Sequence, residues 1–244
     1  MSVESIEPGQ RRGMAAKLSV IAPALAVVGV ALSYLGLVPP FAGFVLMGLG
    51  LLAGIAGAIV GAIGASRGRA GQGFSAAVCA ATVVAILLPA FSAGGLPRIN
   101  DITTDVEDPP VFVHAGTLGP NVGRDMAYPG EEFARQQVPA YPNLSHVITA
   151  DPPEVVFDRV RAALASLPGT EVTFEDRATG HIEGKSTSTI FRFVDDIVVR
   201  IRPFESGSKI DVRSKSRDGK GDLGANAARI KALFAALAAG SGQG

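Results

Sequence analysis

The sequence predicts an α+β protein with a membrane-spanning N-terminal half. We expect a bundle of three transmembrane helices, then a two-layer sandwich in which two helices cover one face of a four-stranded antiparallel sheet. Two observations predict this. Between Leu18 and Ala93 the only charged side chains are Arg67 and Arg69. After Pro97 the chain is rich in charge, and its apolar positions change from a helical period to a period of two and back.

Composition limits the function classes. The net charge is zero and tryptophan is absent, so the basic stripe or stacking rings of a nucleic-acid surface are missing and we expect no nucleic-acid partner. The single cysteine, Cys79, allows neither a disulfide nor a cysteine-based zinc site within one chain. His114, His146 and His181 are scattered without ligand spacing. We therefore expect no metal and no cofactor.

Three stretches reach the roughly twenty apolar residues that cross about 30 Å of hydrocarbon. They are 18–38, 41–65 and 74–93. The second contains glycine pairs, Gly50 with Gly54 and Gly57 with Gly61, at the spacing that lets helix backbones approach closely. A soluble core is the alternative, but consecutive runs of this length would leave it no polar face. Membrane insertion is the better interpretation.

The N-terminal flank, with Arg11, Arg12 and Lys17, also resembles the start of a cleavable signal. The apolar run that follows is longer than the core of a typical signal, so we favour an uncleaved span. A membrane protein keeps its short basic flanks in the cytoplasm. The tail, 1–17, and the second connection, with Arg67 and Arg69, are therefore expected to be cytoplasmic.

With three spans, this charge pattern places everything after Gly94 on the extracytoplasmic side of a bacterial cytoplasmic (inner) membrane. The chain would then be a multi-pass protein of that membrane, with the lipid bilayer as its first partner. The inference depends on the number of spans, because one span more or fewer reverses the side on which the C-terminal domain lies.

Residues 95–150 form a proline-rich segment, with strings such as Asp108-Pro109-Pro110 that are typical of turns. The segment also carries too many large apolar groups for a free linker. These are Ile99, Ile102, Phe112, Phe133 and Tyr141. We expect an ordered strap lying along the domain that follows it.

The domain 151–240 opens with Asp151-Pro152-Pro153-Glu154, which predicts a helix with Asp151 as its N-cap. Alternation predicts strands over 171–176 and 182–190. Two longer strands follow, and then a helix starting near Asp222. The apolar stripe of this last helix comprises Leu223, Ala227, Ile230, Phe234 and Leu237.

The two longer strands are the most informative part of the chain. In 191–202 one parity is apolar except for Asp195, and the other is mostly charged. A turn over 205–208 leads to a strand in which Ile210 and Val212 alternate with charged residues. A four-residue turn would place three pairs opposite each other. They are Arg202 with Asp211, Arg200 with Arg213, and Asp196 with Arg217. We expect a charged, solvent-facing sheet surface.

Four strings in this half resemble one bacterial family, known only as domain-of-unknown-function family 1499. They are INDITTD at 99–105, FVDDIVVR at 193–200, DVRSKSR at 211–217 and GDLGANAARI at 221–230. The resemblance covers roughly residues 97–238. It implies a domain that is often attached to membrane spans and that has no established activity.

Asp195 lies on the otherwise apolar face, where an unpaired carboxylate costs several kcal/mol. We expect a partner, either Arg229 or Arg217, in an ion pair that locks helix to sheet. The functional alternative is a polar pocket for an anionic or sugar-like ligand, which arginines recognise well. The candidate ligand-binding residues are Asp195, Asp196, Arg200, Arg213, Arg217, Asn226 and Arg229. Asp101 to Asp105 offer oxygen ligands to a cation or, more simply, hydrogen bonds to the domain.

Two function classes remain. The first is a membrane-anchored extracytoplasmic binding or scaffold module whose partner is an envelope protein, a lipid or a cell-wall component. The alternative is an envelope hydrolase that uses Asp195 or Asp196 with nearby arginines. Adjacent strand residues point to opposite faces, so the two aspartates do not share a site. We favour the binding module and assign no catalytic residue.

Overall fold

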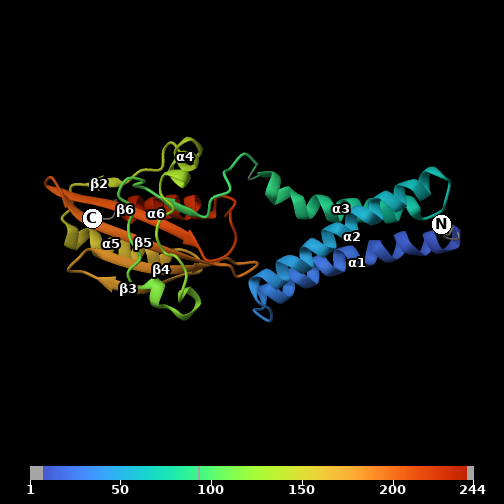
Figure 1. The fold of residues 1–244 in the computed structure, drawn as a ribbon, viewed down its shortest axis with the longest axis horizontal. Helices are drawn as coiled ribbons and strands as arrows, with labels where there is room; N and C mark the ends of the chain where they lie inside the picture. Colours follow the sequence, from blue (N-terminus) through green and yellow to red (C-terminus); the bar gives the residue numbers. More distant parts are fainter. Residues whose placement is uncertain (1–7, 93, 241–244) are drawn as a thin grey trace. The chain divides into compact units, whose positions relative to one another are not determined.

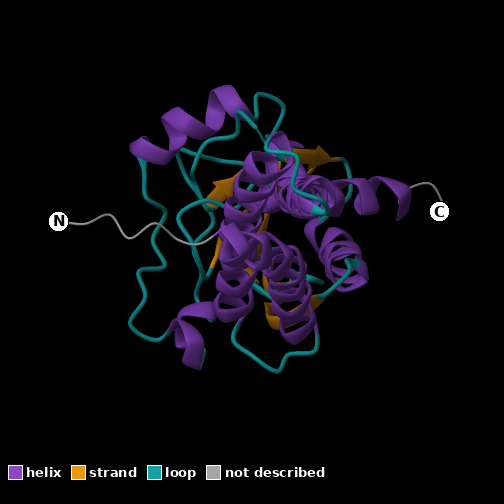
Figure 2. Cartoon of the chain, turned by 90° about the vertical axis from the view of Figure 1, so that its right-hand side faces the viewer, coloured by secondary structure: helices purple, strands orange, loops and turns teal. Residues whose placement is uncertain are grey.

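The computed structural model describes residues 8–92 and 94–240, which divide into two compact units (Figure 1). The first contains the described residues up to Gly94 together with Thr189–Arg192. The second contains Gly95–Ser188 and the residues from Phe193 onward. Figure 2 separates helices from strands, and all strands belong to the second unit. The two units are taken in turn.

The first unit is built from three helices: α1 (Pro8–Tyr34), α2 (Pro40–Ser66) and α3 (Gln72–Ser92). Pro40 occupies the first turn of α2, where its missing N–H costs no hydrogen bond. The predicted tail, 1–17, is helical from Pro8 onward, and its residues 1–7 lie outside the described residues.

The buried positions of α2 are all glycines: Gly43, Gly50, Gly54, Gly57, Gly61 and Gly64. Large apolar side chains point away from the bundle instead. Val20, Val27, Phe41, Leu52, Ile59, Phe74, Val84 and Leu88 are all exposed. A water-soluble bundle buries its large side chains. This unit therefore presents an apolar outer surface and packs on a seam of small residues, which suits helices surrounded by lipid.

Among the described residues two helices, not three, are long and apolar enough to cross a membrane: Gly13–Tyr34 and Pro40–Ser66. Only 22% of the residues in each apolar window are buried, unlike the core helix of a soluble protein. The third predicted span, 74–93, does form a helix, α3. Its described apolar stretch, Gln72–Leu88, falls short of eighteen residues, because the side chains of its last turn lie outside the described set. The prediction of three spans is corrected to two.

The glycine seam gives the first testable prediction. A Cβ at Gly57 would lie 2.4 Å from Cys79 Sγ and 2.9 Å from Leu18 Cβ, whereas a Cβ at Gly48 would meet nothing within 4 Å. Gly57→Ala should therefore destabilise the bundle by about 1–3 kcal/mol through overpacking. Gly48→Ala should be neutral or stabilising by up to about 1 kcal/mol, since alanine favours helix.

The two variants can be compared by the thermal unfolding midpoint of the full chain in detergent. A lower midpoint for Gly57→Ala alone is expected, and equal midpoints would contradict the packing described for α2 and α3.

In its described residues the second unit contains one antiparallel sheet of six strands, not the four predicted. They are β1 (Asp101–Thr103), β2 (Val147–Thr149), β3 (Thr170–Asp176), β4 (His181–Thr187), β5 (Val194–Phe204) and β6 (Gly207–Ser216). The order is β1-β6-β5-β4-β3, and β2 pairs with another part of β6. The two additional strands come from the strap. Each has three residues, too few for alternation to reveal them.

One face of the sheet is covered by α5 (Pro153–Ser166) and α6 (Ala225–Gly240). Their buried side chains share a single core with those of the strands. It includes Val156, Val160, Leu164, Ile182, Ile197, Val199, Val212, Ala227, Ile230 and Leu233. The two-layer α+β arrangement is therefore confirmed.

Both helix starts differ from the prediction in detail. Pro152, not Asp151, precedes α5 and provides no side-chain cap, while the Asp151 carboxylate accepts a hydrogen bond from Arg159. Before α6, Leu223 and Gly224 adopt positive φ, so helix begins at Ala225 and Leu223 is exposed rather than part of the stripe. Asp222 still caps α6, because it accepts from the Asn226 N–H at 2.8 Å.

The β5–β6 turn has two residues, Glu205 and Ser206, because Phe204 pairs with Gly207. Glu205 supports this tight turn with a φ of 51°. The predicted four-residue turn is therefore wrong, and the register shifts by two. Arg200 faces Asp211, Arg202 faces Lys209, Val198 faces Arg213 and Asp196 faces Lys215.

The strap, 95–150, crosses the sheet face opposite α5 and α6 (Figure 1). Besides β1 and β2 it contains two short 3-10 turns, η1 (Ala115–Thr117) and η2 (Gly119–Asn121), and the helix α4 (Glu131–Ala140). The Gln137 amide of α4 accepts from the Thr103 N–H at 3.0 Å and donates to the Thr103 carbonyl at 2.7 Å. The side chain thus replaces a missing neighbouring strand at the β1 edge.

Candidate ligand-binding site

The charged face of β4, β5 and β6 is buried under the strap, so the predicted solvent-facing surface is wrong. Glu183, Asp196, Asp211 and Arg213 are all almost completely buried on this face, which we call the strap face. The physical reason is visible in the strap: its main-chain and side-chain polar groups pair with these charges. A buried charge that is paired and hydrogen-bonded avoids most of its desolvation cost.

Glu183 on β4 fastens the middle of the strap. Its carboxylate accepts the backbone N–H groups of Val113, His114 and Ala115 at 2.5, 3.0 and 2.6 Å. The His181 ring lies 2.8 Å from it. Burial by itself raises the pKa of Glu183, but the His181 contact and the three N–H groups together lower the pKa below its ordinary value of 4.5. The carboxylate is therefore held ionised at neutral pH.

Arg213 on β6 fastens the start of the strap. Its Nε and Nη2 each donate to Asp101 at 2.8 Å, and Nη1 and Nη2 donate to the carbonyls of Pro110 and Met126. Lys215 adds a second cation 2.9 Å from Asp101. This bidentate pair is completely buried, and every nitrogen of the guanidinium has a partner. It is a fixed structural element.

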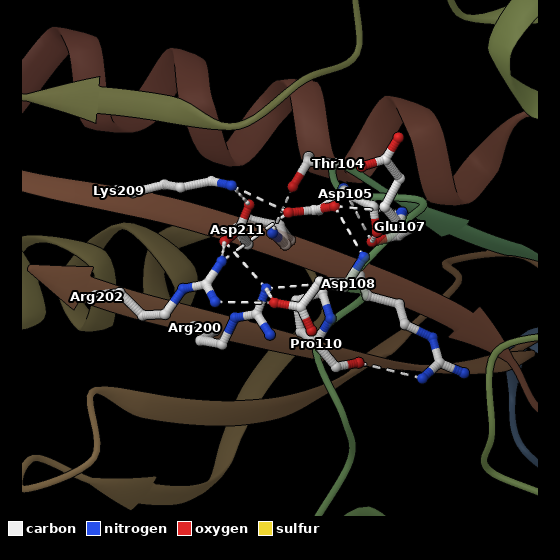
Figure 3. A network of polar contacts seen from close by, with 12 residues as sticks. Thr104, Asp105, Glu107, Asp108, Pro110, Arg200, Arg202, Lys209 and Asp211 are labelled. Atoms are coloured by element: carbon white, nitrogen blue, oxygen red, sulfur yellow. Dashed lines mark hydrogen bonds and ion pairs between the residues drawn. The ribbon is translucent and has the colours of Figure 1, made fainter. Parts of the chain in front are cut away.

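A third group of charges lies near the β5–β6 turn, where β5 ends and β6 begins, and Figure 3 shows it from close by. Asp211 is buried and lies 3.2 Å from Arg200 and 3.0 Å from Arg202. Asp108 of the strap meets the same two arginines at 3.2 and 2.8 Å. Lys209 donates to Asp105 at 3.0 Å. Hydrogen bonds from Arg202 and then Arg200 lower the pKa of Asp108 below its ordinary value.

The adjacent aspartates Asp195 and Asp196 point to opposite faces, and each is paired with an arginine. Asp195 accepts from Arg229 Nη2 at 2.6 Å, which is one of the two partners expected for it. Asp196 accepts from Arg217 at 2.9 and 2.5 Å and from Asn121 at 2.8 Å. Each carboxylate is thus engaged by side chains of the protein.

The seven predicted site residues therefore lie at four separate places. Asp195, Asn226 and Arg229 lie with Ser214 under α6, where Asn226 accepts from Ser214 at 2.7 Å and Arg229 at 2.8 Å. Asp196 and Arg217 lie at one end of the strap face, and Arg200 at the other. Arg213 lies between them. The structure does not bring the seven into one pocket.

A hollow of about 410 Å³ opens on the strap, and its lining is mostly apolar. It is formed by Val106, Glu107, Pro109, Val111, Phe112, Met126, Ala127, Tyr128, Gly130 and Arg213. The Tyr128 hydroxyl is buried and has no hydrogen-bond partner among the described residues. Burial, and then the charge of Asp101, raise the pKa of Tyr128 to about 12, so its O–H remains a donor at neutral pH.

Comparison with protein-family models matches residues 101–237 to the family described as Protein of unknown function (DUF1499). The match covers more than half of the 244 residues. The chain belongs to this family. The resemblance found in the sequence is thereby confirmed, and the DUF1499 domain spans the sheet, both covering helices and most of the strap. No curated protein and no solved structure matches the chain.

Several residues of the strap face escaped sequence reasoning. Glu183 stands in a short strand whose alternation is interrupted by Gly184, so its face could not be assigned. Asn121 lies in a loop without any periodic signal. The one available signal was the string Asp101 to Asp105, whose residues hydrogen-bond to the domain. Within the described part of the chain, no group of three or more histidine, cysteine or acidic side chains could hold a metal ion.

The Glu183 contacts predict that the strap loosens in acid. The folded-state pKa of Glu183 is depressed, so its contribution to stability is fully present above pH 4.5 and is lost as pH falls below 4.5 through the lower folded value. Glu183→Gln should lower the protection of the 113–115 amides by about 3 kcal/mol at pH 7, since a buried charged acceptor is lost. The variant should also show a weaker acid dependence.

Hydrogen exchange of a peptide covering residues 110–118 measures both effects in the full chain. Glu171→Gln is the matched control, because that carboxylate is exposed and pairs only with Lys185 at the surface. It should change protection by less than about 1 kcal/mol. Equal effects of the two substitutions would show that Glu183 does not hold the strap.

Proposed function

We propose that this DUF1499 protein is a non-enzymatic binding or scaffold module anchored in the bacterial cytoplasmic (inner) membrane by its N-terminal helices. The anchor is supported by the inverted packing of the first unit, with glycines inside and large apolar side chains outside. An apolar surface of this extent is costly in water and favourable in lipid. The binding role is carried by one observation, the mostly apolar hollow on the strap.

We further propose that the DUF1499 domain is extracytoplasmic and meets an envelope protein or a cell-wall component. Supporting this side, the short flanks that carry Lys17, Arg67 and Arg69 favour the cytoplasm. This side requires α3 to cross as a third span, in addition to the two candidate spans. Its 21 residues cover roughly 30 Å at 1.5 Å per residue, which matches the thickness of the hydrocarbon.

Cell fractionation followed by proteolysis tests the anchor and its orientation together. The full chain is expected to stay with the membrane after an alkaline carbonate wash. Protease added outside intact spheroplasts should then digest the DUF1499 domain. Release by carbonate would contradict the anchor. Protection of the domain until the membrane is broken would place it in the cytoplasm and leave α3 as a helix that does not cross.

The ligand of the hollow should be an apolar group that offers a hydrogen-bond acceptor. Val106, Val111, Phe112 and Met126 supply an apolar lining. Tyr128 also lines the hollow, and we propose that its O–H, buried and unpaired among the described residues, becomes the donor when the ligand enters. A buried donor without a partner is costly, and a ligand acceptor would relieve that cost. The arginine of the lining, Arg213, contributes little, because four of its five N–H donors are already paired.

The hydrolase alternative receives no support from the same geometry. Its two candidate acids, Asp195 and Asp196, are each bound by an arginine, and neither lines the hollow. A general acid or base must reach a substrate proton within hydrogen-bond distance. The binding module therefore remains the function that the arrangement favours.

A photo-crosslinking amino acid at Val111 tests the binding face in cells. Val111 is exposed at the hollow, whereas Val155 is exposed on α5, which covers the opposite face of the sheet. An adduct is expected from position 111 and not from the control at 155, and Tyr128→Phe should reduce it. Adducts from both positions, or from neither, would refute the hollow as the contact surface.

A further inference from the structure

We propose that Arg200 and Arg202 form a binding fork for a phosphate group, and that Asp108 is a built-in competitor which occupies the fork in the free protein. This inference is independent of the hollow and of the orientation in the membrane. It begins with one oxygen: Asp108 Oδ2 lies 2.8 Å from Arg202 Nη1 and 3.2 Å from Arg200 Nη2. A carboxylate thus sits where two guanidinium groups converge (Figure 3).

The fork does not need Asp108 to hold its shape. Asp211 is completely buried beneath it, and its Oδ2 accepts from Arg200 Nη2 at 3.2 Å and from Arg202 Nη2 at 3.0 Å. The two arginines are two residues apart on β5, so their side chains leave the strand on the same face. The guanidinium groups would therefore stay in place when the Asp108 carboxylate leaves, and a preorganised site binds at a smaller entropic cost.

Among the strap's three paired aspartates, only Asp108 can be exchanged easily. Its side chain is 62% exposed, while those of Asp105 and Asp101 are 16% and 0% exposed. The Asp108 carbonyl separately accepts from Arg200 Nη2 at 2.6 Å, so the main chain has its own attachment. Rotation of one surface side chain is enough to open the fork, and such rotations are fast.

Charge decides which ligand fits. Arg200, Arg202 and Lys209 are balanced by Asp105, Asp108 and Asp211, so the group is neutral only while Asp108 is in place. Withdrawal of Asp108 leaves one net positive charge between two arginines. A phosphate group brings more negative charge and more acceptor oxygens than the carboxylate it replaces, and paired arginines recognise it bidentately.

Titration calorimetry with inorganic phosphate on the full chain in a neutral detergent tests the fork. Asp108→Asn removes the competing charge and should lower the phosphate Kd by about tenfold, the size of one charge-assisted hydrogen bond. Adding Arg202→Gln to that variant should abolish the gain. Asp108→Ala provides the same test without a side-chain amide, and thermal unfolding confirms that each variant is folded.

Two exposed charges outside the fork provide matched controls. Glu107→Gln removes an exposed carboxylate one residue away, which forms no ion pair within the described structure. It should change the phosphate Kd by less than about twofold. Lys220→Gln removes an exposed cation away from the fork and should likewise leave the Asp108→Asn affinity unchanged. Equal gains from Asp108→Asn and Glu107→Gln would overturn the proposal, as would the absence of phosphate binding in every variant.

A second titrant separates the two natural sources of such a group. A short-chain phosphatidic acid, used below its micelle concentration, presents phosphate on a lipid. Equal gains in the Asp108→Asn variant for the lipid and for inorganic phosphate would assign recognition to the phosphate group alone. A gain confined to the lipid would assign the fork to a headgroup. If neither titrant responds to Asp108→Asn, the fork is only an internal ion pair.

Discussion

The second unit depends on one constraint: the buried charge of Arg213 has to be neutralised, and Asp101 does this. Arg213 is inside the protein because its strand is covered on both faces, and an unpaired cation there would cost several kcal/mol. The carboxylate that pairs with Arg213 belongs to Asp101 of the strap, more than a hundred positions earlier in the chain. β1 forms beside β6 at this point. The strap is thus a layer of the fold, and the sheet cannot be stable on this face without it.

The same constraint sets the course of the strap beyond β1. Asp105 meets Lys209, Asp108 meets the two arginines of β5, and the 113–115 amides meet Glu183. Each contact pairs a group of the strap with an opposite partner on the sheet. Proline-rich chain is well suited to this path, since it leaves few free backbone donors and carries the acidic side chains across in an extended form. A consequence is that the charged side chains of the strap face are used mainly for internal contacts.

The fold was more predictable than the site, and the difference is physical. Period-two alternation located β3 to β6 within a few residues because each has seven or more residues, and the apolar stripe from Ala227 located α6. Alternation also placed Asp195 and Asp196 on opposite faces. Alternation could not reveal that the charged face of the sheet is buried, because burial under an irregular segment leaves no periodic pattern in the sequence. The two-residue turn at Glu205 likewise altered the register by two, although Arg202 still reaches Asp211 diagonally.

The strings that resemble the DUF1499 family have a shared role in the structure. INDITTD holds Asp101, and DVRSKSR holds its β6 partners Arg213 and Lys215. FVDDIVVR holds Asp196, and GDLGANAARI holds the residues that join α6 to the sheet. Every string contributes to contacts between layers, and none converges with another on an accessible cavity. The family signature therefore describes how strap, sheet and helix are fastened together. Ligand recognition must then depend on positions outside the strings or at their ends, and Asp108, Val111 and Tyr128 lie outside all four.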